Sequence, residues 1–389
     1  MEEVLYRYNP WWEGAKVDGF IERPAAFSQI KQHLSSQQII FLTGIRRVGK
    51  TTLLKLLIRS LIDEGIPSSH ILYISLDDYL LSKHTILKII EEYRKIHKIR
   101  FNEKIYLFLD EVTYQADFEV QLKNIYDAHH AKVYASSSVA SILKGRKSYL
   151  TGRNVLIEVL PLDFREYLGF KGIALSKADS HLIDSYFEDY MCTGGLPEYV
   201  IRGDIGYLKE LVDDIIYKDI AAVHGIKNPQ LLKDFFLLLM ERAGKTASLN
   251  KMANILNISP DTAKRYFEMF CDTYLIYPVM RCGKTTERIV SPKKVYAADL
   301  GVRTFFTGFR DKGSLFENYV YLNIRHKNPC YIYEDGGEID FLTEDKTLIE
   351  VKYKGEMQEK QRSLFERVKA REKVVLRCLS DLEGFLDRT

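Results

Sequence analysis

Short apolar runs alternate with helical stretches along the first 160 residues of the chain. Five runs, rich in β-branched, aromatic and leucine side chains, are typical of strands. They lie at residues 39–42, 71–76, 105–109, 132–135 and 154–160. Between most of them apolar positions recur with the spacing of a helix, as in residues 51–63. This alternation predicts an α/β region in which helices cover a parallel sheet.

The pattern changes near residue 163. Helical periodicity dominates from there to residue 277, and strand and helix patterns mix after Pro292. The chain has 389 residues, which is more than one compact core usually holds, so several domains are expected. We place an α/β core at residues 1–163, a helical linker at 164–227, a second helical domain at 228–310 and a small α/β domain at 311–389.

The composition excludes several classes of protein. Hydrophobic residues make up 46% and charged residues 28%, as in ordinary globular domains. The longest purely apolar stretch, residues 235–240, is far shorter than the ~20 residues of a membrane-spanning helix, so we expect no membrane partner. The N-terminus lacks the basic and apolar regions of a secretory signal. The net charge is only +3, so a nucleic-acid surface has to be a local patch.

The cysteines predict a reduced, cytoplasmic protein. They are scattered, odd in number and contain no Cys-x-x-Cys pair, which argues against a disulfide framework or a structural zinc site. The five positions are Cys192, Cys271, Cys282, Cys330 and Cys378.

A complete phosphate-binding loop lies between the first predicted strand and the first long helix. It matches G-x-x-x-x-G-K-[ST] in full, and the strand-to-helix context gives the pattern its meaning. The glycines let backbone N–H groups point at phosphate oxygens, and the helix N-terminus adds positive potential. Lys50 is expected to reach the outer phosphates and the Thr51 hydroxyl to ligate Mg²⁺. The predicted ATP contacts are Gly44, Ile45, Arg46, Arg47, Val48, Gly49, Lys50, Thr51 and Thr52.

Two other Gly-Lys-Thr triplets do not form such a loop. They end at Thr246 and Thr285, and six residues before their lysines stand Leu239 and Pro278 in place of glycine. Neither can therefore make the glycine turn that the phosphates require.

Two acids follow the strand at residues 105–109. The carboxyl edge of a parallel sheet is where ligands bind, so Asp110 and Glu111 are expected beside the phosphate loop. We assign Asp110 to hold magnesium indirectly and Glu111 to polarise the attacking water as a catalytic residue.

Two further candidates for phosphate contacts come later in the same region. The three serines at residues 136–138 follow the fourth strand, and Ser137 is the candidate that senses the γ-phosphate; a plain small-residue turn is the alternative. Arg153 is a candidate arginine finger, since charge develops on the phosphoryl group; a solvated surface arginine is the alternative.

These motifs together resemble a known family. Residues 8–12 (Tyr-Asn-Pro-Trp-Trp), the phosphate loop, the serine run, residues 150–153 and residues 160–167 are similar to prokaryotic, largely archaeal, AAA-type P-loop ATPases. The resemblance implies a winged helix in the middle of the chain and a C-terminal nuclease-like domain. AAA-type proteins often form rings in which a neighbour supplies the arginine finger, so the resemblance allows a homo-oligomer.

The middle of the chain has helix-turn-helix spacing. A short amphipathic helix at 248–257 precedes a longer one that Ser259 and Pro260 begin and that runs through residue 276. A hairpin wing is expected at 277–295. Residues 241–294 contain ten Lys or Arg and five Asp or Glu, which suits DNA phosphates. Lys264 and Arg265 are the candidate DNA contacts, and a winged helix used only for packing is the alternative.

The C-terminal region places two acids and a lysine on a predicted hairpin. If the turn is centred on Asp345, Asp340 lies opposite Glu350, ~5 Å apart at Cβ. Two carboxylates at that distance repel unless a cation lies between them, and Mg²⁺ or Mn²⁺ suits oxygen ligands. Lys352 shares the face of Glu350 and could orient water as a catalytic group.

This arrangement is similar to the PD-(D/E)xK nuclease pattern. The resemblance implies that Glu317, on the preceding helix, is an additional metal ligand, although Ser314 and Glu317 also fit a capping box. Ile339 stands where that pattern has proline. A surface hairpin with an incidental acid pair is the plain alternative.

Three functions remain open at this point. The first is an ATPase that acts on DNA and has a metal-dependent endonuclease domain. The second is a nucleotide-dependent switch or scaffold that binds partners without cleavage. The third is a defence or mobile-element nuclease.

Overall fold

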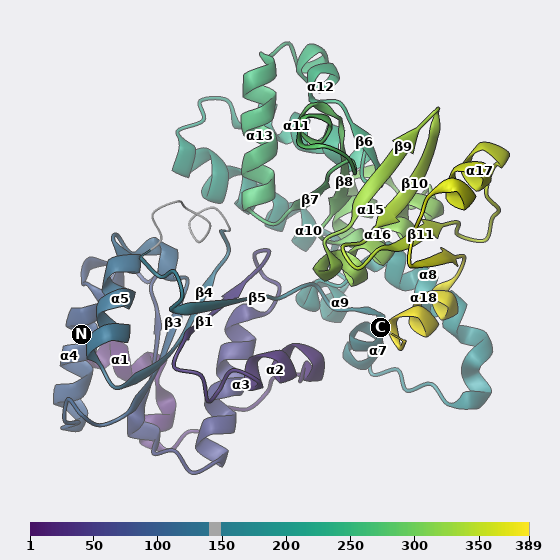
Figure 1. Cartoon of the computed structure of the whole chain (residues 1–389). Helices are drawn as coiled ribbons and strands as arrows, with labels where there is room; N and C mark the ends of the chain where they lie inside the picture. The colour runs from purple at the N-terminus through teal and green to yellow at the C-terminus, as the bar shows by residue number, and fades with distance from the viewer. Residues whose placement is uncertain (140–148, 389) are drawn as a thin grey trace. The chain divides into compact units, whose positions relative to one another are not determined.

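The computed structural model describes residues 1–139 and 149–388 of the chain. It divides into two compact units, Met1–Leu160 and Pro161–Thr389, each of which is described separately (Figure 1). Within these described residues no helix is both long and apolar enough to cross a bilayer.

The first unit contains a five-stranded parallel sheet in the order β2-β3-β4-β1-β5. All five strands coincide with the predicted apolar runs, so the predicted parallel α/β sheet is confirmed. Burial on both faces explains why the runs are continuously apolar rather than alternating. The strands are β1 (Ile39–Thr43), β2 (Ile71–Ser75), β3 (Ile105–Asp110), β4 (Ala131–Ser137) and β5 (Asn154–Glu158).

Helices cover both faces of this sheet. Figure 1 shows α1, α4 and α5 on one face and α2 and α3 on the other. In α4 the buried residues Ile86, Ile89, Ile90 and Tyr93 recur at helical spacing and join the core beneath the sheet. The helices are α1 (Glu2–Tyr8), α2 (Pro24–Lys31), α3 (Lys50–Asp63), α4 (Ile86–His97) and α5 (Phe118–Ala128), with 3₁₀ turns at Pro10–Glu13, Ser68–His70, Leu81–Lys83 and Val112–Tyr114.

The second unit begins with a helical region. It comprises α7 (Phe164–Phe170), α8 (Ile183–Thr193), α9 (Pro197–Arg202), α10 (Ile205–Asp214) and α11 (Pro229–Glu241), with a 3₁₀ turn at Lys177–Leu182 and a π-helical stretch at Ile215–Ala222.

A buried carboxylate connects this region to a later helix. Asp299 accepts hydrogen bonds from the N–H groups of Gly195 (2.6 Å) and Val302 (2.9 Å), and it caps α15 (Leu300–Thr307). An ideal Cβ at Gly195 would lie 2.1 Å from the carbonyl oxygen of Leu162, so only glycine fits there. Burial raises the pKa of the Asp299 carboxyl to about 6, although these N–H donors act in the opposite direction.

Two helices and a small sheet follow. α12 (Leu249–Leu256) and α13 (Pro260–Asp272) begin at caps, and the Ser259 hydroxyl accepts the N–H of Thr262 at 3.1 Å. The expected helix through residue 276 is wrong: α13 ends at Asp272, because Tyr274 has a positive φ of 59° that a helix cannot continue. Strands β6 (Lys245–Ala247), β7 (Ile276–Val279) and β8 (Lys293–Ala297) form an antiparallel sheet in the order β6-β8-β7, and α14 (Thr285–Val290) lies between β7 and β8.

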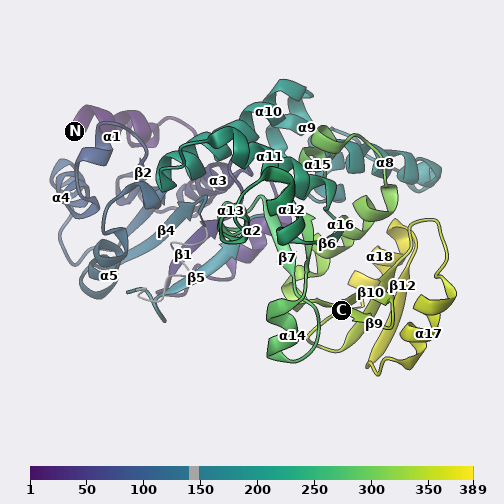
Figure 2. The ribbon, with the colours of Figure 1, turned by 90° about the horizontal axis from the view of Figure 1, so that it is seen from above.

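The chain ends in a four-stranded sheet in the order β12-β11-β10-β9. Helix α17 packs on one face, while α16 and α18 pack on the other (Figure 2). Phe341 pairs with Ile349 in the β10–β11 hairpin, so Asp340 lies next to Glu350 in the expected register. The elements are α16 (Lys312–Ile324), β9 (Cys330–Glu334), β10 (Gly337–Leu342), β11 (Thr347–Val351), α17 (Glu359–Arg367), β12 (Glu372–Leu376) and α18 (Leu379–Leu386), with a 3₁₀ turn at Arg325–Lys327.

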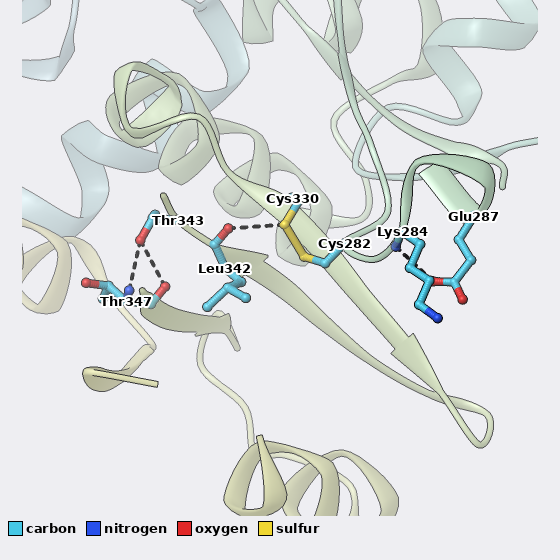
Figure 3. The surroundings of a disulfide bond; sticks show 7 residues. All are labelled: Cys282, Lys284, Glu287, Cys330, Leu342, Thr343 and Thr347. Carbon is cyan, nitrogen blue, oxygen red and sulfur yellow. Dashed lines mark hydrogen bonds between the residues drawn. A yellow bond between two sulfur atoms is a disulfide. The ribbon is translucent and has the colours of Figure 1, made fainter. Parts of the chain in front are cut away.

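A disulfide joins Cys282 to Cys330, so the expectation of no disulfide is wrong for this pair (Figure 3). The two cysteines are 48 residues apart. The chain after β7 runs beside β9, where the Cys282 N–H donates to the Tyr331 carbonyl at 2.7 Å. Their spacing in the sequence contains no sign of this contact. Cys192, Cys271 and Cys378 are not part of this disulfide.

Candidate functional site

The phosphate loop begins where β1 ends. Gly44 has a φ of 135°, and an ideal Cβ there would lie 2.3 Å from the carbonyl oxygen of Val159. Only glycine therefore fits at this position of the loop. Gly49, with a φ of 100°, is the N-cap of α3, and as a glycine it has no side chain with which to cap the helix. The first N–H groups of α3 are therefore suited to phosphate oxygens.

The Lys50 side chain is held over this loop. Its ammonium group donates to the carbonyls of Gly44 (2.9 Å) and Ile45 (3.1 Å), and the residue is buried. This places a positive charge at the loop, as the sequence predicts for a phosphate ligand.

Arg23 supports the loop from outside, which sequence reasoning missed. Its guanidinium donates to the carbonyl of Val48 at 3.1 Å and to that of Leu160 at 2.9 Å. The buried guanidinium thereby connects the loop to the chain that follows β5. An isolated arginine before Pro24 carries no pattern that would reveal this role.

Asp110 receives a ring of hydroxyl donors at the carboxyl edge of the sheet. The Thr51 hydroxyl donates to its Oδ2 at 2.6 Å, and the Tyr73 hydroxyl donates to the same oxygen at 2.8 Å. The Ser136 hydroxyl donates to Oδ1. Asp110 is only 2% exposed. A hydroxyl and a carboxylate in direct contact are the oxygen donors that Mg²⁺ prefers, so these residues fit a nucleotide-bound magnesium ion.

Glu111 is half-buried next to this contact and has the left-handed φ of 50°. The Ser138 hydroxyl donates to its carboxylate at 3.2 Å. Burial raises the pKa of the Glu111 carboxyl, while the nearby Lys50 charge lowers it. A carboxylate with an elevated pKa is a better proton acceptor for water, which suits the expected base.

The three serines at residues 136–138 make different contacts, and Ser137, the predicted phosphate sensor, is not the one that contacts the acids. Ser136 contacts Asp110 and Ser138 contacts Glu111, whereas the Ser137 hydroxyl turns to the backbone of Val139, at 3.1 and 3.2 Å. The structure therefore brings the two flanking serines to the acids and occupies Ser137 in a turn.

Arg153 lies at the amino ends of the parallel strands, opposite the ends that carry the phosphate loop. Its carbonyl accepts the N–H of Ile39, the first residue of β1, and its guanidinium pairs with Asp127 at 3.0 Å. The phosphate loop follows the last residue of β1, so Arg153 does not reach the nucleotide site of its own chain. As an arginine finger it remains a prediction only for a neighbouring subunit.

The C-terminal acids meet as the pattern predicts. Glu350 is fully buried, and its carboxylate accepts the N–H of Asp340 at 3.2 Å. The carboxylate of Asp340 accepts the N–H of Val351 at 2.9 Å. The Lys352 ammonium lies 2.6 Å from Glu350. Glu317 of α16 joins the same cluster.

A lysine that the sequence reasoning did not assign lies at the centre of this cluster. The Lys294 ammonium, from β8, lies 2.9 Å from Glu317 and 2.8 Å from both Glu338 and Asp340. The Tyr296 hydroxyl donates to the same Glu317 oxygen at 2.6 Å. Burial alone would lower the pKa of Lys294, but the charges of Asp340 and Glu317 hold it well above its usual value.

The predicted metal ligands of this cluster therefore need a correction. In the part of the chain that the structure describes, no group of three or more His, Cys, Asp and Glu side chains is arranged to hold a metal ion. The physical reason is that Glu317 and Asp340 bind the Lys294 ammonium and Glu350 pairs with Lys352. Burial, reinforced by the charge of Asp340, raises the pKa of Glu317 to about 7 and that of Glu350 to about 8.

The capping box expected at Ser314 and Glu317 does not form. Asp311 is the N-cap of α16 and accepts the N–H of Ser314 at 3.3 Å. Glu317 instead accepts hydrogen bonds from Lys294 and Tyr296.

The candidate DNA contacts lie on the surface of α13. Lys264 and Arg265 are both exposed, although Asp261 and Glu268 are exposed on the same helix. A groove of about 440 Å³ runs between the starts of α12 and α13 and the segment after α14, and Lys264 lines it. Lys294, which counts toward the basic composition of this region, is buried among acids and is not part of that surface.

The sheet, the glycine loop and the acids at its edge define a P-loop nucleotide-binding domain. Residues 36–168 match the family model described as an AAA domain. Residues 184–313 match a second model, described as a domain of unknown function (DUF8612).

The chain is 30% identical over 370 residues to the uncharacterized protein MJ1544 of Methanocaldococcus jannaschii, and the match covers 89% of this chain and 80% of that protein. It belongs to the same family as MJ1544. An uncharacterized protein of Haemophilus influenzae is 25% identical over 341 residues, covering 83% of each chain. Among solved structures, AMPPCP-bound DnaA from Aquifex aeolicus is 20% identical over 67% of this chain and 91% of that chain, with a TM-score of 0.34.

Proposed function

We propose that the chain hydrolyses ATP at the phosphate loop and that the bound nucleotide controls DNA binding by the second unit. The observation that carries the first half is the 2.6 Å contact between the Thr51 hydroxyl and Asp110, the two groups expected to hold Mg²⁺. The AAA-domain match over residues 36–168 supports the same assignment.

Each residue of the site has one role in this proposal. The loop N–H groups and Lys50 bind the phosphates, and Thr51 with Asp110 holds Mg²⁺. Magnesium, when bound, neutralises charge on the phosphate oxygens. Glu111 orients a water molecule and accepts its proton, and Ser138 positions the Glu111 carboxylate. Titration calorimetry should detect ATP binding in the presence of Mg²⁺, and phosphate release should follow. A chain that binds no ATP would contradict the proposal.

For DNA binding by the second unit, we propose that α12, α13 and the β7–β8 sheet form a winged helix. The capped helix pair, the antiparallel strands that follow it and the exposed Lys264 and Arg265 support this interpretation. Duplex DNA binding should weaken with salt, because Lys and Arg displace counterions from phosphates.

A charge-matched pair of variants tests this surface. Lys264→Ala combined with Arg265→Ala should weaken DNA binding and reduce the slope of log K against log salt by about 2. Lys369→Ala combined with Arg371→Ala removes the same charge from exposed positions near β12 and should leave the slope unchanged. Equal slopes in the two double variants would contradict the assignment.

Control by the nucleotide is tested by measuring DNA affinity in three states. We expect the apo, ATP-bound and ADP-bound chains to differ in DNA affinity. A nucleotide changes DNA binding only if it binds the DNA-binding conformation and the other conformation with different affinity. Identical affinity in all three states would contradict the control while leaving ATP hydrolysis and DNA binding standing.

Endonuclease activity is the second candidate function. The convergence of Glu317, Asp340, Glu350 and Lys352 favours a PD-(D/E)xK-like domain, whereas the Lys294 ion pairs favour a domain that binds without cleaving. Single-stranded, duplex and branched DNA should be offered with Mg²⁺ or Mn²⁺, with and without ATP. Cleavage that Asp340→Ala abolishes would establish an endonuclease, and Lys50→Ala would show whether ATP controls it. Intact DNA throughout would support the non-cleaving switch.

A further inference from the structure

The acids of the C-terminal domain already have a cation among them. The Lys294 ammonium lies 2.8–2.9 Å from oxygens of Glu317, Glu338 and Asp340, and its side chain is 1% exposed. The ammonium donates hydrogen bonds to Glu317 and Asp340, and Glu338 lies at ion-pair distance. A buried positive charge therefore contacts two of the predicted metal ligands, Glu317 and Asp340.

The distances in the cluster are those of charge-assisted hydrogen bonds. Magnesium would need its oxygen ligands at about 2.0–2.1 Å. An ion bound to the Glu317 and Asp340 oxygens that Lys294 contacts would overlap its ammonium group. Lys294 consequently occupies the position that a metal between these two oxygens would take, and the Lys352 ammonium lies 2.6 Å from Glu350.

The surrounding structure fixes Lys294 in this position. It belongs to β8, the middle strand of its sheet, where it pairs with Thr246 on one side and Val279 on the other. Tyr296, two residues further along the same strand, donates to the Glu317 oxygen that Lys294 contacts. Withdrawing the ammonium would leave like-charged carboxylates together in a buried site, which is strongly unfavourable.

We propose that Lys294 is the resident cation of this acid site: the wild-type chain takes no divalent metal there, and the acids form a metal site only when Lys294 is removed. In the wild-type chain the cluster instead connects β8 to α16 and β10 through ion pairs. The inference rests on the nuclease-like arrangement proposed above, but its test needs neither ATP nor DNA.

The test is a Mn²⁺ titration of the full chain without nucleotide, with free Mn²⁺ followed by electron paramagnetic resonance. Lys294→Met should bind one more Mn²⁺ per chain than the wild type, and adding Asp340→Asn should remove that ion. Lys327→Met is the matched control, because Lys327 also pairs with an acid of this domain, Asp345, at 3.3 Å. It should gain no Mn²⁺.

Two outcomes would overturn the proposal. One is Mn²⁺ binding by the wild type that Asp340→Asn abolishes, and the other is a folded Lys294→Met chain without the additional ion. If Lys294→Met does not fold, Lys294→Gln and amine acylation of the wild type decide the question. Lys294 should resist acylation equally with and without Mn²⁺; acylation that rises when Mn²⁺ is added would show that metal displaces the lysine. Failure of ATP hydrolysis would leave all these readouts unaffected.

Discussion

Each of the two units buries acidic side chains close to lysines, but the charges are paired differently. In the first unit Asp110 accepts hydrogen bonds from the hydroxyls of Thr51 and Tyr73, and Lys50 donates to loop carbonyls. In the second unit Lys294 lies 2.8 Å from Asp340, and Lys352 lies 2.6 Å from Glu350.

The difference lies in the donors and not in the acids. Hydroxyl donors orient Asp110 without adding positive charge, so a metal ion carried in with phosphates still finds a negative ligand. Ammonium donors neutralise the C-terminal acids, so a metal would have to displace a buried ion pair. The partners of a carboxylate thus determine whether an acidic pair is suited to metal binding.

The largest expected effect comes from Lys50→Ala. It should weaken ATP binding and lower turnover by more than about 10³-fold, because the phosphates lose their positively charged ligand. Phosphate release and calorimetry measure the two effects. Lys284→Ala, in a Gly-Lys-Thr triplet of the second unit, is the control and should hydrolyse ATP normally. If Lys50→Ala hydrolysed ATP within tenfold of the wild-type rate, the phosphate loop of the first unit would not be the site of hydrolysis.

Glu111→Gln should separate binding from chemistry at the same site. ATP should still bind, while turnover falls on the order of 10²–10⁴-fold, because the amide cannot accept a proton from water. Single-turnover assays after ATP loading measure this step, and Glu119→Gln on α5 is the control. Normal turnover of Glu111→Gln would show that the base is another residue.

Lys294→Met tests the opposite side of the comparison. Removing one partner from buried ion pairs should lower the free energy of unfolding of the second unit by ~3–5 kcal/mol. Urea unfolding followed by far-UV circular dichroism measures it, and ATP turnover should not change. Lys293→Met is the control: its ammonium lies 5.5 Å from the Phe267 ring, a contact worth roughly 0.5–1 kcal/mol. A similar loss of unfolding free energy in both variants would mean that the Lys294 ion pairs contribute no more stability than the Lys293 contact.

The smallest effect concerns pH and Asp299. Its pKa is about 6 in the folded chain, above the ~3.9 of an unfolded aspartate, so the folded state binds the proton more tightly. The stability from this group is present below pH ~4 and is lost as the pH rises to about 6, a change of roughly 1–3 kcal/mol.

The measurement for Asp299 is a difference between two chains. Urea unfolding of the wild type and of Asp299→Asn should be followed across this pH range, so that other acids cancel. The wild type should lose stability relative to the variant as the pH rises. A relative gain would mean that the N–H donors from Gly195 and Val302 outweigh burial.

Local patterns predicted the first unit well. Each strand of its sheet is a continuous apolar run, and the loop residues follow β1 directly, so sequence neighbours are also neighbours in the site. Tyr73 was missed as a donor to Asp110 because it belongs to β2 and is brought to β3 only by strand pairing.

The second unit was harder to predict because its site depends on distant residues. Asp340 and Glu350 were found through hairpin register, but Lys294 is separated from Glu317 by 23 residues and from Asp340 by 46. One local signal was present: Lys294 directly precedes the apolar run at residues 295–298, and a lysine inside such a strand needs a buried partner. Nothing in the sequence identifies that partner.

The position of the tryptophans has a practical consequence. The chain has two, Trp11 and Trp12, and both belong to the first unit. Trp12 stacks on Tyr93, and Trp11 lies 4.9 Å from the ammonium of Lys55, whose pKa burial lowers to about 8 against the attraction of Asp110. Fluorescence excited only in tryptophan therefore comes from the first unit alone. Tryptophan fluorescence can therefore follow the unfolding of the first unit separately from that of the second, without an added label.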